Sequence, residues 1–249
     1  MNLEPKLEQV RQEYLRRLSV ETFHETSLPH DETALQSVLE HVTSRTGKML
    51  RPRLTLLAAA TLGDEHLNSR RTLMLATAVE MLHNASLLHD DVIDRADTRR
   101  GQPSVNARWG NATAVLVGDW LLAQIMRLLD EVDDRSATRL VNRTVIEMVE
   151  AELLQQTVET FHETSLPHDE TALPITPDTY LKIIDGKTAR LFATACALGN
   201  PLYEDFGLHY GRLFQMRDDI ADGEAPDFVD KLIEQETQEI NNLKYKLSI

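Results

Sequence analysis

Two short clusters of aspartates are the residues of this chain best suited to chemistry. They lie at residues 90–94 and 218–222, and each places Asp at its first, second and fifth positions. On a helix turning by about 100° per residue, the first and last aspartates of a cluster lie about 40° apart, on one face. Six such carboxylates would repel one another and would be costly to bury unless cations neutralised them. Oxygen donors without Cys or His suit Mg²⁺, which often shares its coordination sphere with phosphates, so the paired clusters predict a metal-bridged diphosphate site.

Taken alone, either cluster would also suit a solvated helix end. The residues before the clusters, 82–89 and 210–216, are mostly apolar or small, so each cluster is expected where a core-facing helix ends. An EF-hand does not fit, because that loop spreads its acidic ligands over about twelve residues around a central glycine. The presence of two copies favours the metal site.

A basic segment, residues 47–53, precedes the first cluster. Gly47 marks a helix end, and Pro52 suits the first turn of the next helix. Lys48 and Arg51 are then expected at a helix N-terminus, where backbone N–H groups and the helix dipole favour an anion such as a diphosphate. A solubilising basic turn is the alternative for this segment by itself.

Further polar residues flank both clusters. His83 lies two helical turns before Asp90, on the same expected stripe, where it could donate to a phosphate, although a lone His on an apolar face usually belongs to the core. Arg99 and Arg100 follow the first cluster with forked donors that match phosphate oxygens. In the C-terminal half, a lysine inside an apolar helix and a glutamine on the face of the second cluster are expected to point inward; they are Lys187 and Gln215.

Helical periodicity dominates the chain and strand alternation is absent, so we predict an all-α bundle in a single domain, residues 1–249. The expected helices are near residues 3–19, 33–46, 51–62, 68–95, 103–108, 111–130, 134–158, 177–198, 203–221 and 227–247. Residues 20–35 recur identically as 158–173, and the second copy is expected to be a surface insertion. Its Pro, Ser, Thr and Asp residues predict that at least its second half is a loop.

The composition narrows the class of protein. A net charge of −14 and a pI near 5.1 argue against binding to nucleic acid or to an anionic membrane. The single cysteine, Cys196, lies in an apolar run and is expected to fill the core in a reducing compartment. The N-terminus lacks a secretory pattern and the apolar runs look too short to cross a bilayer, so a soluble, cytoplasmic protein is expected.

The ordered set of motifs resembles the trans-isoprenyl diphosphate synthases of the polyprenyl synthetase family. The matching blocks are Gly-Lys-x-x-Arg-Pro at 47–52, His-x-Ala-Ser-Leu-x-His-Asp-Asp-Val-x-Asp at 83–94, Arg-Arg-Gly at 99–101, Ala-Val-Leu-Val-Gly-Asp at 114–119, Glu-Leu-Leu-Gln at 152–155, Lys-Thr-Ala at 187–189 and Phe-Gln-x-x-Asp-Asp-x-x-Asp at 214–222. They cover most of residues 40–222. The resemblance implies an isoprenoid-synthase-type helical bundle around a central cavity, and a homodimer.

The resemblance also implies a role for each matching residue. The metal ligands for Mg²⁺ would be Asp90, Asp91, Asp94, Asp218, Asp219 and Asp222. Together with these aspartates, Lys187 would act on the allylic diphosphate, beside Arg99, Thr188 and Gln215. The second substrate, isopentenyl diphosphate, would be bound by Lys48, Arg51, His83 and Arg100. The expected reaction is ionisation of the allylic diphosphate followed by attack of the isopentenyl double bond, without a protein nucleophile.

The chain departs from the family pattern after the second cluster. Relatives continue with a Gly-Lys pair, a further Asp and several helices, whereas here one charged helix follows, so the C-terminal helices are expected to be shortened. Lys231 is the nearest candidate for the missing lysine. A non-catalytic subunit of a heteromeric synthase is therefore an alternative, although such subunits typically lose aspartates. A terpene cyclase is another, although its second metal site is normally an Asn/Ser/Glu triad.

Product length in such enzymes depends on side chains below the first cluster. Ala85 and Ser86 are small where shorter-chain relatives carry an aromatic plug, so we predict a product longer than farnesyl diphosphate. Met81 and Leu82, one turn deeper, are the candidate floor of the tunnel.

Overall fold

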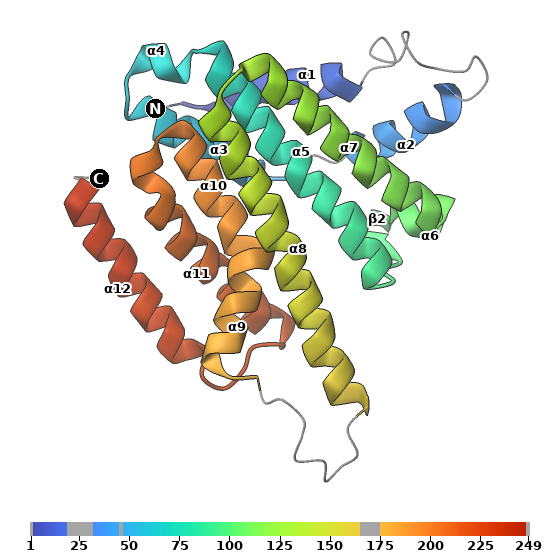
Figure 1. The fold of residues 1–249 in the computed structure, drawn as a ribbon, viewed down its shortest axis with the longest axis vertical. Coiled ribbons are helices and arrows are strands. Elements are labelled where there is room, and N and C mark those ends of the chain that lie inside the picture. Colours follow the sequence, from blue (N-terminus) through green and yellow to red (C-terminus); the bar gives the residue numbers. More distant parts are fainter. Residues whose placement is uncertain (1, 19–31, 45–46, 165–174, 248–249) are drawn as a thin grey trace. The chain divides into compact units, whose positions relative to one another are not determined.

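The computed structural model describes the chain except for residues 1, 19–31, 45–46, 165–174 and 248–249. The described residues are almost entirely helical, which confirms the all-α class (Figure 1). They form two compact units, Met1–Asp134 and Arg135–Ile249. The boundary follows Asp133, whose left-handed backbone (φ 51°) ends the last helix of the first unit. The expectation of one domain over residues 1–249 stays a prediction.

The first unit contains seven helices and one short hairpin among its described residues. They are α1 (Glu4–Leu18), α2 (Glu32–Ser44), α3 (Leu50–Ala60), α4 (Asp64–Leu67), α5 (Arg70–Ile93), β1 (Thr98–Arg99), β2 (Gln102–Pro103), α6 (Val105–Trp109) and α7 (Asn111–Val132). Helix α5 begins where the Ser69 hydroxyl accepts the Thr72 N–H at 3.1 Å, and most of its residues are buried. It is therefore the central helix of this unit, with α7 alongside it (Figure 1).

The hairpin was not expected from the sequence. Its two strands pair antiparallel over only two residues each, too few for a visible alternation of polar and apolar residues. The connecting residues Arg100 and Gly101 both have positive φ, 53° and 74°, as a type I′ turn requires. The hairpin fixes the backbone on both sides of the paired arginines.

Helix α7 is long and apolar enough to cross a membrane by length and composition alone, contrary to the estimate that every apolar run is too short. The core helix of a globular protein meets the same criteria, and 44% of the most apolar window of α7 is buried in the structure. Its buried face, which includes Val117, Leu121 and Leu128, packs in the unit that contains α5. We therefore interpret α7 as a core helix.

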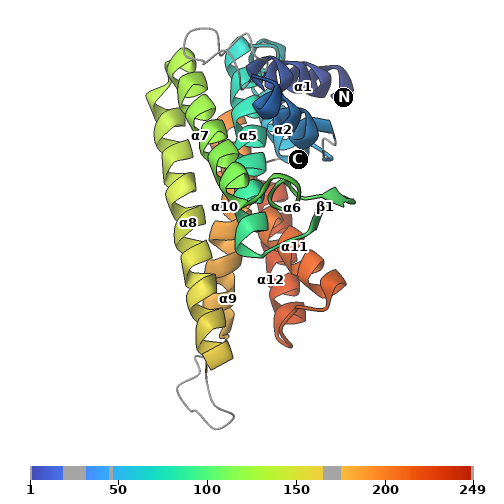
Figure 2. The same ribbon diagram turned by 90° about the vertical axis from the view of Figure 1, so that its right-hand side faces the viewer.

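The second unit is helical throughout its described residues. Its elements are α8 (Arg135–Thr164), α9 (Pro177–Ile184), the π-helical turn η2 (Asp185–Ala189), α10 (Arg190–Gly199), the 3₁₀ turn η3 (Pro201–Tyr203), α11 (Glu204–Asp222) and α12 (Val229–Leu247). Figure 2 shows α8, α9 and α10 on one side of this unit and α11 and α12 on the other. Every residue of α10 after Arg190 is buried, including Cys196, whose pKa burial raises to about 12. Cys196 is thus the core residue that its sequence context predicts.

Close contact between α10 and α11 depends on two glycines of α11. A Cβ on Gly207 would lie 2.6 Å from the carbonyl oxygen of Phe192, and one on Gly211 would lie 2.5 Å from Ala189 Cα. Larger residues would push α11 away from α10. These glycines therefore set the position of the helix that ends in the second aspartate cluster.

The observed helices agree with the expected ranges to within two residues, except that the range 134–158 extends to Thr164 and the range 177–198 is interrupted by the π-helical turn. The short helix α4 was not expected. In the second copy of the duplicated segment, residues 158–164 continue α8. Residues 20–31 of the first copy and 165–173 of the second lie outside the described residues, so the surface insertion and the loop stay predictions.

A buried arginine ties α1 to α7. The Arg17 guanidinium donates to both carboxylate oxygens of Glu131 at 2.7 Å and to Glu13 at 2.8 Å, and its side chain is only 3% exposed. Hydrogen bonds from Arg16 and Arg17 hold the pKa of Glu13 and of Glu131, respectively, below the ordinary value. The stabilisation by these carboxylates is present above their unfolded pKa and is lost as pH falls through the folded pKa.

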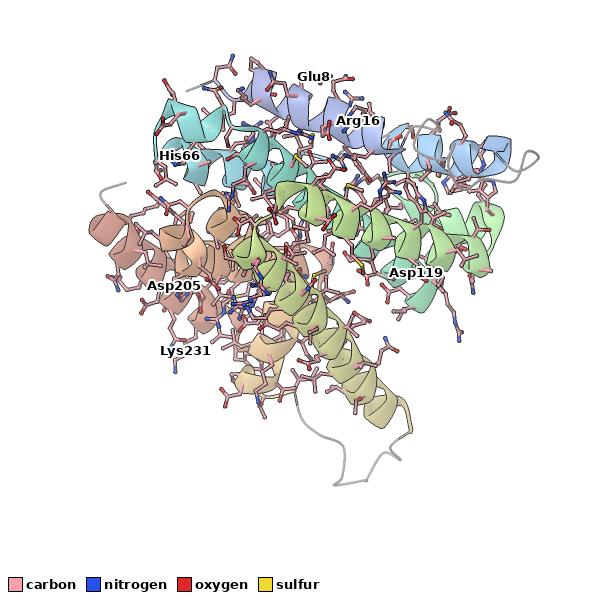
Figure 3. The ribbon with its side chains drawn as sticks, turned by 45° about the horizontal axis from the view of Figure 1, so that its top comes forward. Glu8, Arg16, His66, Asp119, Asp205 and Lys231 are labelled. Carbon is pink, nitrogen blue, oxygen red and sulfur yellow. The ribbon has the colours of Figure 1, made fainter. Side chains whose placement is uncertain are left out.

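Glu131→Gln is expected to destabilise the first unit by about 1–2 kcal/mol at neutral pH, less than for a fully buried pair because the Glu131 side chain is partly exposed. The loss should shrink in acid, where Glu131 of the unaltered chain also becomes neutral. Thermal unfolding at neutral pH and in acid measures the loss of stability. Glu8→Gln is the control, since Glu8 lies on the outer face of α1 (Figure 3). Equal losses in both variants would contradict a specific role for the Arg17 pair.

Candidate functional site

Both aspartate clusters lie at the C-terminal end of a helix. Helix α5 ends at Ile93 and Asp94 follows as its cap, with its N–H donating to the Asp90 carbonyl at 2.8 Å. Helix α11 ends at Asp222, and Gly223 (φ 76°) turns the chain away. The C-terminal end of a helix carries partial negative charge, so carboxylates here are disfavoured unless cations or hydrogen-bond donors compensate. The two positions agree with the sequence prediction.

In the first cluster, the middle aspartate is held by protein groups. Asp91 is 3% exposed and accepts from Arg99, whose Nε lies 2.7 Å from Oδ1 and whose terminal nitrogen also contacts this oxygen. The Asp91 carbonyl accepts from the Asn106 amide at 3.0 Å. Asp90 is partly exposed and Asp94 is exposed. The outer pair therefore offers carboxylates outward while the middle one pairs with Arg99.

The second cluster repeats this division. Asp219 accepts from the Gln215 amide at 2.7 Å and from the Tyr180 hydroxyl at 2.5 Å. Burial and the hydrogen bond to Asp219 raise the pKa of Tyr180, so the phenol keeps its proton and donates it. Asp218 and Asp222 are exposed. In both clusters, the first and last aspartates are more exposed than the middle one.

The donor set suits a hard divalent cation bound together with phosphates. Among the residues that the structure describes, no three His, Cys, Asp or Glu side chains converge into a complete metal site. Mg²⁺ typically takes only one or two carboxylates and fills its remaining positions with water and substrate phosphates. The exposed outer aspartates match that requirement. Metal ligation by all six aspartates stays a prediction, and Asp91 and Asp219 also accept hydrogen bonds from protein groups.

Positive charge gathers around His83 in the first unit. Burial lowers the pKa of His83 well below its ordinary value, and the nearby charges of Arg51, Arg100 and Arg99 lower it further. His83 is therefore a neutral donor or acceptor at neutral pH, among three guanidinium groups. Such a group of cations attracts a polyanion.

One buried acid faces this positive region. Glu80 is 3% exposed, and burial raises its pKa while the charges of Arg51 and Arg100 oppose that rise. Its backbone carbonyl accepts from the Asn84 amide at 2.8 Å. Glu80 lies one helical turn before His83 and Asn84. Helix α5 therefore carries a buried acid near the arginines, and the aspartate cluster at its C-terminal end.

The other basic residues predicted to bind phosphate in this unit lie in the positions expected from the sequence. Helix α3 begins at Leu50, so Pro52 and Arg51 are in its first turn and exposed Lys48 lies just before it. Arg100 lies over Gly47, where an added Cβ would be 2.8 Å from Arg100 Nη2. Arg99 and Arg100 also line a small cavity of ≈ 60 Å³ with Asn84, Asp91 and the α2 residue His41.

In the second unit, Lys187 and Thr188 lie on the π-helical turn. Lys187 Nζ donates to Gln155 Oε1 at 2.9 Å and lies 3.4 Å from Glu152 Oε2, both on α8. The Thr188 hydroxyl donates to Gln215 Oε1 at 2.6 Å. Gln215 in turn donates to Asp219, so the turn and the aspartate cluster belong to one hydrogen-bonded network. Of the two residues predicted to point inward, Gln215 belongs to this network, and Lys187 contacts α8 instead.

Lys231, the candidate for the missing lysine, is exposed on α12 (Figure 3). Among the described contacts it has no hydrogen bond or ion pair to the second cluster, and its role stays a prediction.

The residues expected to set product length lie in the middle of α5. Met81, Leu82 and Ala85 are buried at 0–3% exposure, and Ser86 is partly buried. The Ser86 hydroxyl donates to the carbonyl of His83 at 2.9 Å, so its polar group is satisfied within the helix. A larger side chain at Ser86 would extend beyond the helix surface.

Sequence reasoning missed Tyr180, which donates to Asp219, and the neighbouring ion pair of Asp185 with Arg212. Tyr180 lies two turns before Lys187, but the π-helical turn between them inserts an extra residue and shifts the helix faces. Arg212 is three residues before Gln215, on the same face of α11, and that spacing was the available signal.

Comparisons with known proteins identify the family of the chain. The model of the Polyprenyl synthetase family matches residues 32–232. The chain is 40% identical over 197 residues to an all-trans-nonaprenyl-diphosphate synthase (geranyl-diphosphate specific) of Rhodobacter capsulatus. The matched region covers 76% of this chain and 57% of that protein. It is 33% identical over 209 residues to heptaprenyl diphosphate synthase component 2 of Bacillus subtilis, covering 80% and 56%.

A solved structure has the same fold. The polyprenyl synthase of Caulobacter crescentus, complexed with calcium and isoprenyl diphosphate, superposes with a TM-score of 0.73 at 32% identity, covering 87% of this chain and 62% of that one. The chain thus spans somewhat more than half the length of the curated relatives that it matches.

Gly47→Ala is expected to weaken binding of inorganic diphosphate, in the presence of Mg²⁺, by about threefold to tenfold. The added Cβ forces Arg100 to move, because the two would otherwise be 2.8 Å apart. Titration calorimetry measures the affinity. In an Arg100→Ala background, Gly47→Ala should have little further effect. If it is as harmful there as in the unaltered chain, Arg100 is not the group that it displaces.

Proposed function

The chain belongs to the polyprenyl synthetase family, and on that premise we propose that it is a Mg²⁺-dependent prenyltransferase that condenses isopentenyl diphosphate with an allylic diphosphate. One observation carries the proposal: each unit combines a helix-end aspartate cluster, whose outer carboxylates are more exposed than the middle one, with cationic side chains suited to phosphate. This combination fits a diphosphate bound through metal ions. It does not fit a protein nucleophile or a redox centre.

The residues divide into two substrate groups. In the second unit, Lys187, Thr188 and Gln215 bind and orient the departing allylic diphosphate. On the isopentenyl side, Lys48, Arg51, Arg100 and neutral His83 hold the second diphosphate. Mg²⁺, when bound to the outer aspartates, supplies positive charge that lets the allylic C–O bond break with its electron pair leaving on the diphosphate.

The remaining steps need no covalent bond to the protein. The isopentenyl double bond attacks the allylic carbocation, which forms the new C–C bond. Loss of a proton to the released diphosphate then restores a double bond, and the product is one isoprene unit longer. The contribution of this chain is to hold both diphosphates, so that the two reacting carbons are oriented toward each other.

The product is proposed to be longer than farnesyl diphosphate. Ala85 and Ser86 leave little side-chain volume on α5 above Met81 and Leu82. The names of the relatives support this assignment. One is a nonaprenyl-diphosphate synthase and the other is component 2 of a heptaprenyl diphosphate synthase, and both names describe products longer than farnesyl diphosphate.

We further propose a homodimer in the cytoplasm. Leu116 and Met126 of α7 are both 66% exposed, and a second copy would cover this apolar face. The single cysteine supports a reducing compartment. The name "component 2" of the Bacillus subtilis relative raises the alternative of a heteromeric partner, in which the chain would be one subunit of the synthase.

The two rival functions are less well supported. A non-catalytic subunit would not need all six aspartates, which are present here. A terpene cyclase would not need the isopentenyl set of Lys48, Arg51, His83 and Arg100.

The direct test is incubation of the full chain with isopentenyl diphosphate, farnesyl diphosphate and Mg²⁺, followed by chain-length analysis. We expect products longer than farnesyl diphosphate, complete loss on chelation of the metal, and a fall in kcat of about 100-fold or more for Asp90→Asn and Asp218→Asn. Folded protein that elongates nothing would support a non-catalytic subunit, and cyclic hydrocarbons would support a cyclase.

Ser86→Phe is expected to shorten the product, because the aromatic ring would fill the space next to Ala85 on α5. Ser86→Ala is the matched control: it removes the hydroxyl that bonds His83 without adding volume, and should leave the product distribution unchanged. Product analysis by chromatography distinguishes the two. An unchanged distribution for Ser86→Phe would exclude this position from the tunnel.

A further inference from the structure

The π-helical turn η2 presents the phosphate-binding residues of the second unit, and it is an unusual backbone. A π-helical turn accommodates one more residue than an α-helical turn, and such single turns are rare and frequently lie at functional sites. Gly186 allows this turn to lie against α8: an added Cβ would be 2.3 Å from Ala151 Cβ and 2.5 Å from the Glu147 carbonyl oxygen. Packing on α8 therefore fixes one side of the turn.

The opposite side is fixed by an arginine of α11. Arg212 donates from Nε and Nη2 to the two carboxylate oxygens of Asp185, at 2.6 and 2.7 Å. This two-point contact defines the orientation of the carboxylate as well as its distance. Asp185 is the first residue of the turn, two residues before Lys187.

The same arginine has a second anchor on α12. Arg212 Nη1 donates to Glu236 Oε1 at 2.9 Å, and His209 Nδ1 contacts the other oxygen of Glu236. The Glu236 side chain is 8% exposed, so its charge is almost removed from water. Burial alone would raise the pKa of Glu236, but the hydrogen bond from His209 and the charge of Arg212 keep it below its ordinary value. The network therefore stays ionised.

We propose that Arg212 is a positioning residue, which holds the Lys187–Thr188 segment in its phosphate-binding place by bridging Asp185 of the turn and Glu236 of α12. This inference rests on the proposed function. Loss of the bridge frees Asp185, and the turn then shifts Lys187 relative to Gln155 and Thr188 relative to Gln215. Glu236 lies beyond residues 32–232, the part of the chain that the family model matches.

Binding of inorganic diphosphate to the full chain with Mg²⁺, measured by calorimetry, tests the proposal without depending on turnover. Arg212→Met is expected to weaken binding about tenfold. Lys187→Ala should weaken binding of the unaltered chain by about tenfold or more, but by less than about threefold once Arg212 is replaced, because Lys187 is then already displaced. Arg212→Lys, which lacks the fork, should restore little. In turnover assays, KM for the allylic substrate should rise more than kcat falls.

A milder variant tests the same network with less risk of misfolding. Glu236→Gln keeps the shape of the side chain but removes the charge, and is expected to weaken diphosphate binding by about twofold to fivefold. Glu239→Gln is the matched control, since Glu239 is exposed on the same helix. Thermal unfolding of each variant shows whether it is folded at the assay temperature.

Three results separate the possible failures. If folded Arg212→Met and Glu236→Gln bind diphosphate as the unaltered chain does, while Lys187→Ala does not, the network is only structural and the inference is wrong. If the effects of Arg212→Met and Lys187→Ala simply add, Arg212 does not act through Lys187. If the unaltered chain binds no diphosphate, the proposed function is wrong, and the inference, which rests on it, is wrong as well.

Discussion

Negative charge concentrated at the C-terminal ends of two helices is the constraint on which the other features of the site depend. Each cluster places carboxylates where the helix dipole already adds negative charge, so neither is stable without compensation. The middle aspartate of each cluster finds it within the protein, from Arg99 in one unit and from Tyr180 and Gln215 in the other. The outer aspartates are more exposed than the middle ones, so cations can reach them from solvent.

The cationic groups are constrained in turn by acids. Lys187 rests against Glu152, Arg212 against Asp185 and Glu236, and the arginines of the first unit lie near Glu80. Unpaired buried charges are costly, so a site rich in Arg and Lys needs acids that hold the bases without neutralising the whole region.

The sequence predicted the helices and the two clusters because these depend on local signals. Apolar periodicity identified α5 and α11, and the positions of Gly47 and Pro52 identified the start of α3. The hairpin was missed because strands of two residues show no alternation, and its turn depends on Arg100 adopting positive φ. The π-helical turn was missed because its extra residue is visible only in the hydrogen-bonding pattern, and Tyr180 was consequently assigned to no functional face.

Contacts between distant helices form the part of the site that no motif specifies. Arg212 and Glu236 are separated by more than six helical turns of sequence, including the break between α11 and α12, and neither belongs to an aspartate cluster. A residue that binds metal or substrate must keep its amino-acid type, because the chemistry of binding requires it. A residue that supports it needs only the correct charge at the correct distance. A support such as Glu236 can therefore differ among proteins that share all the ligands. For that reason the family pattern predicts which residues bind substrate, while only the structure shows how the turn that carries Lys187 and Thr188 is held.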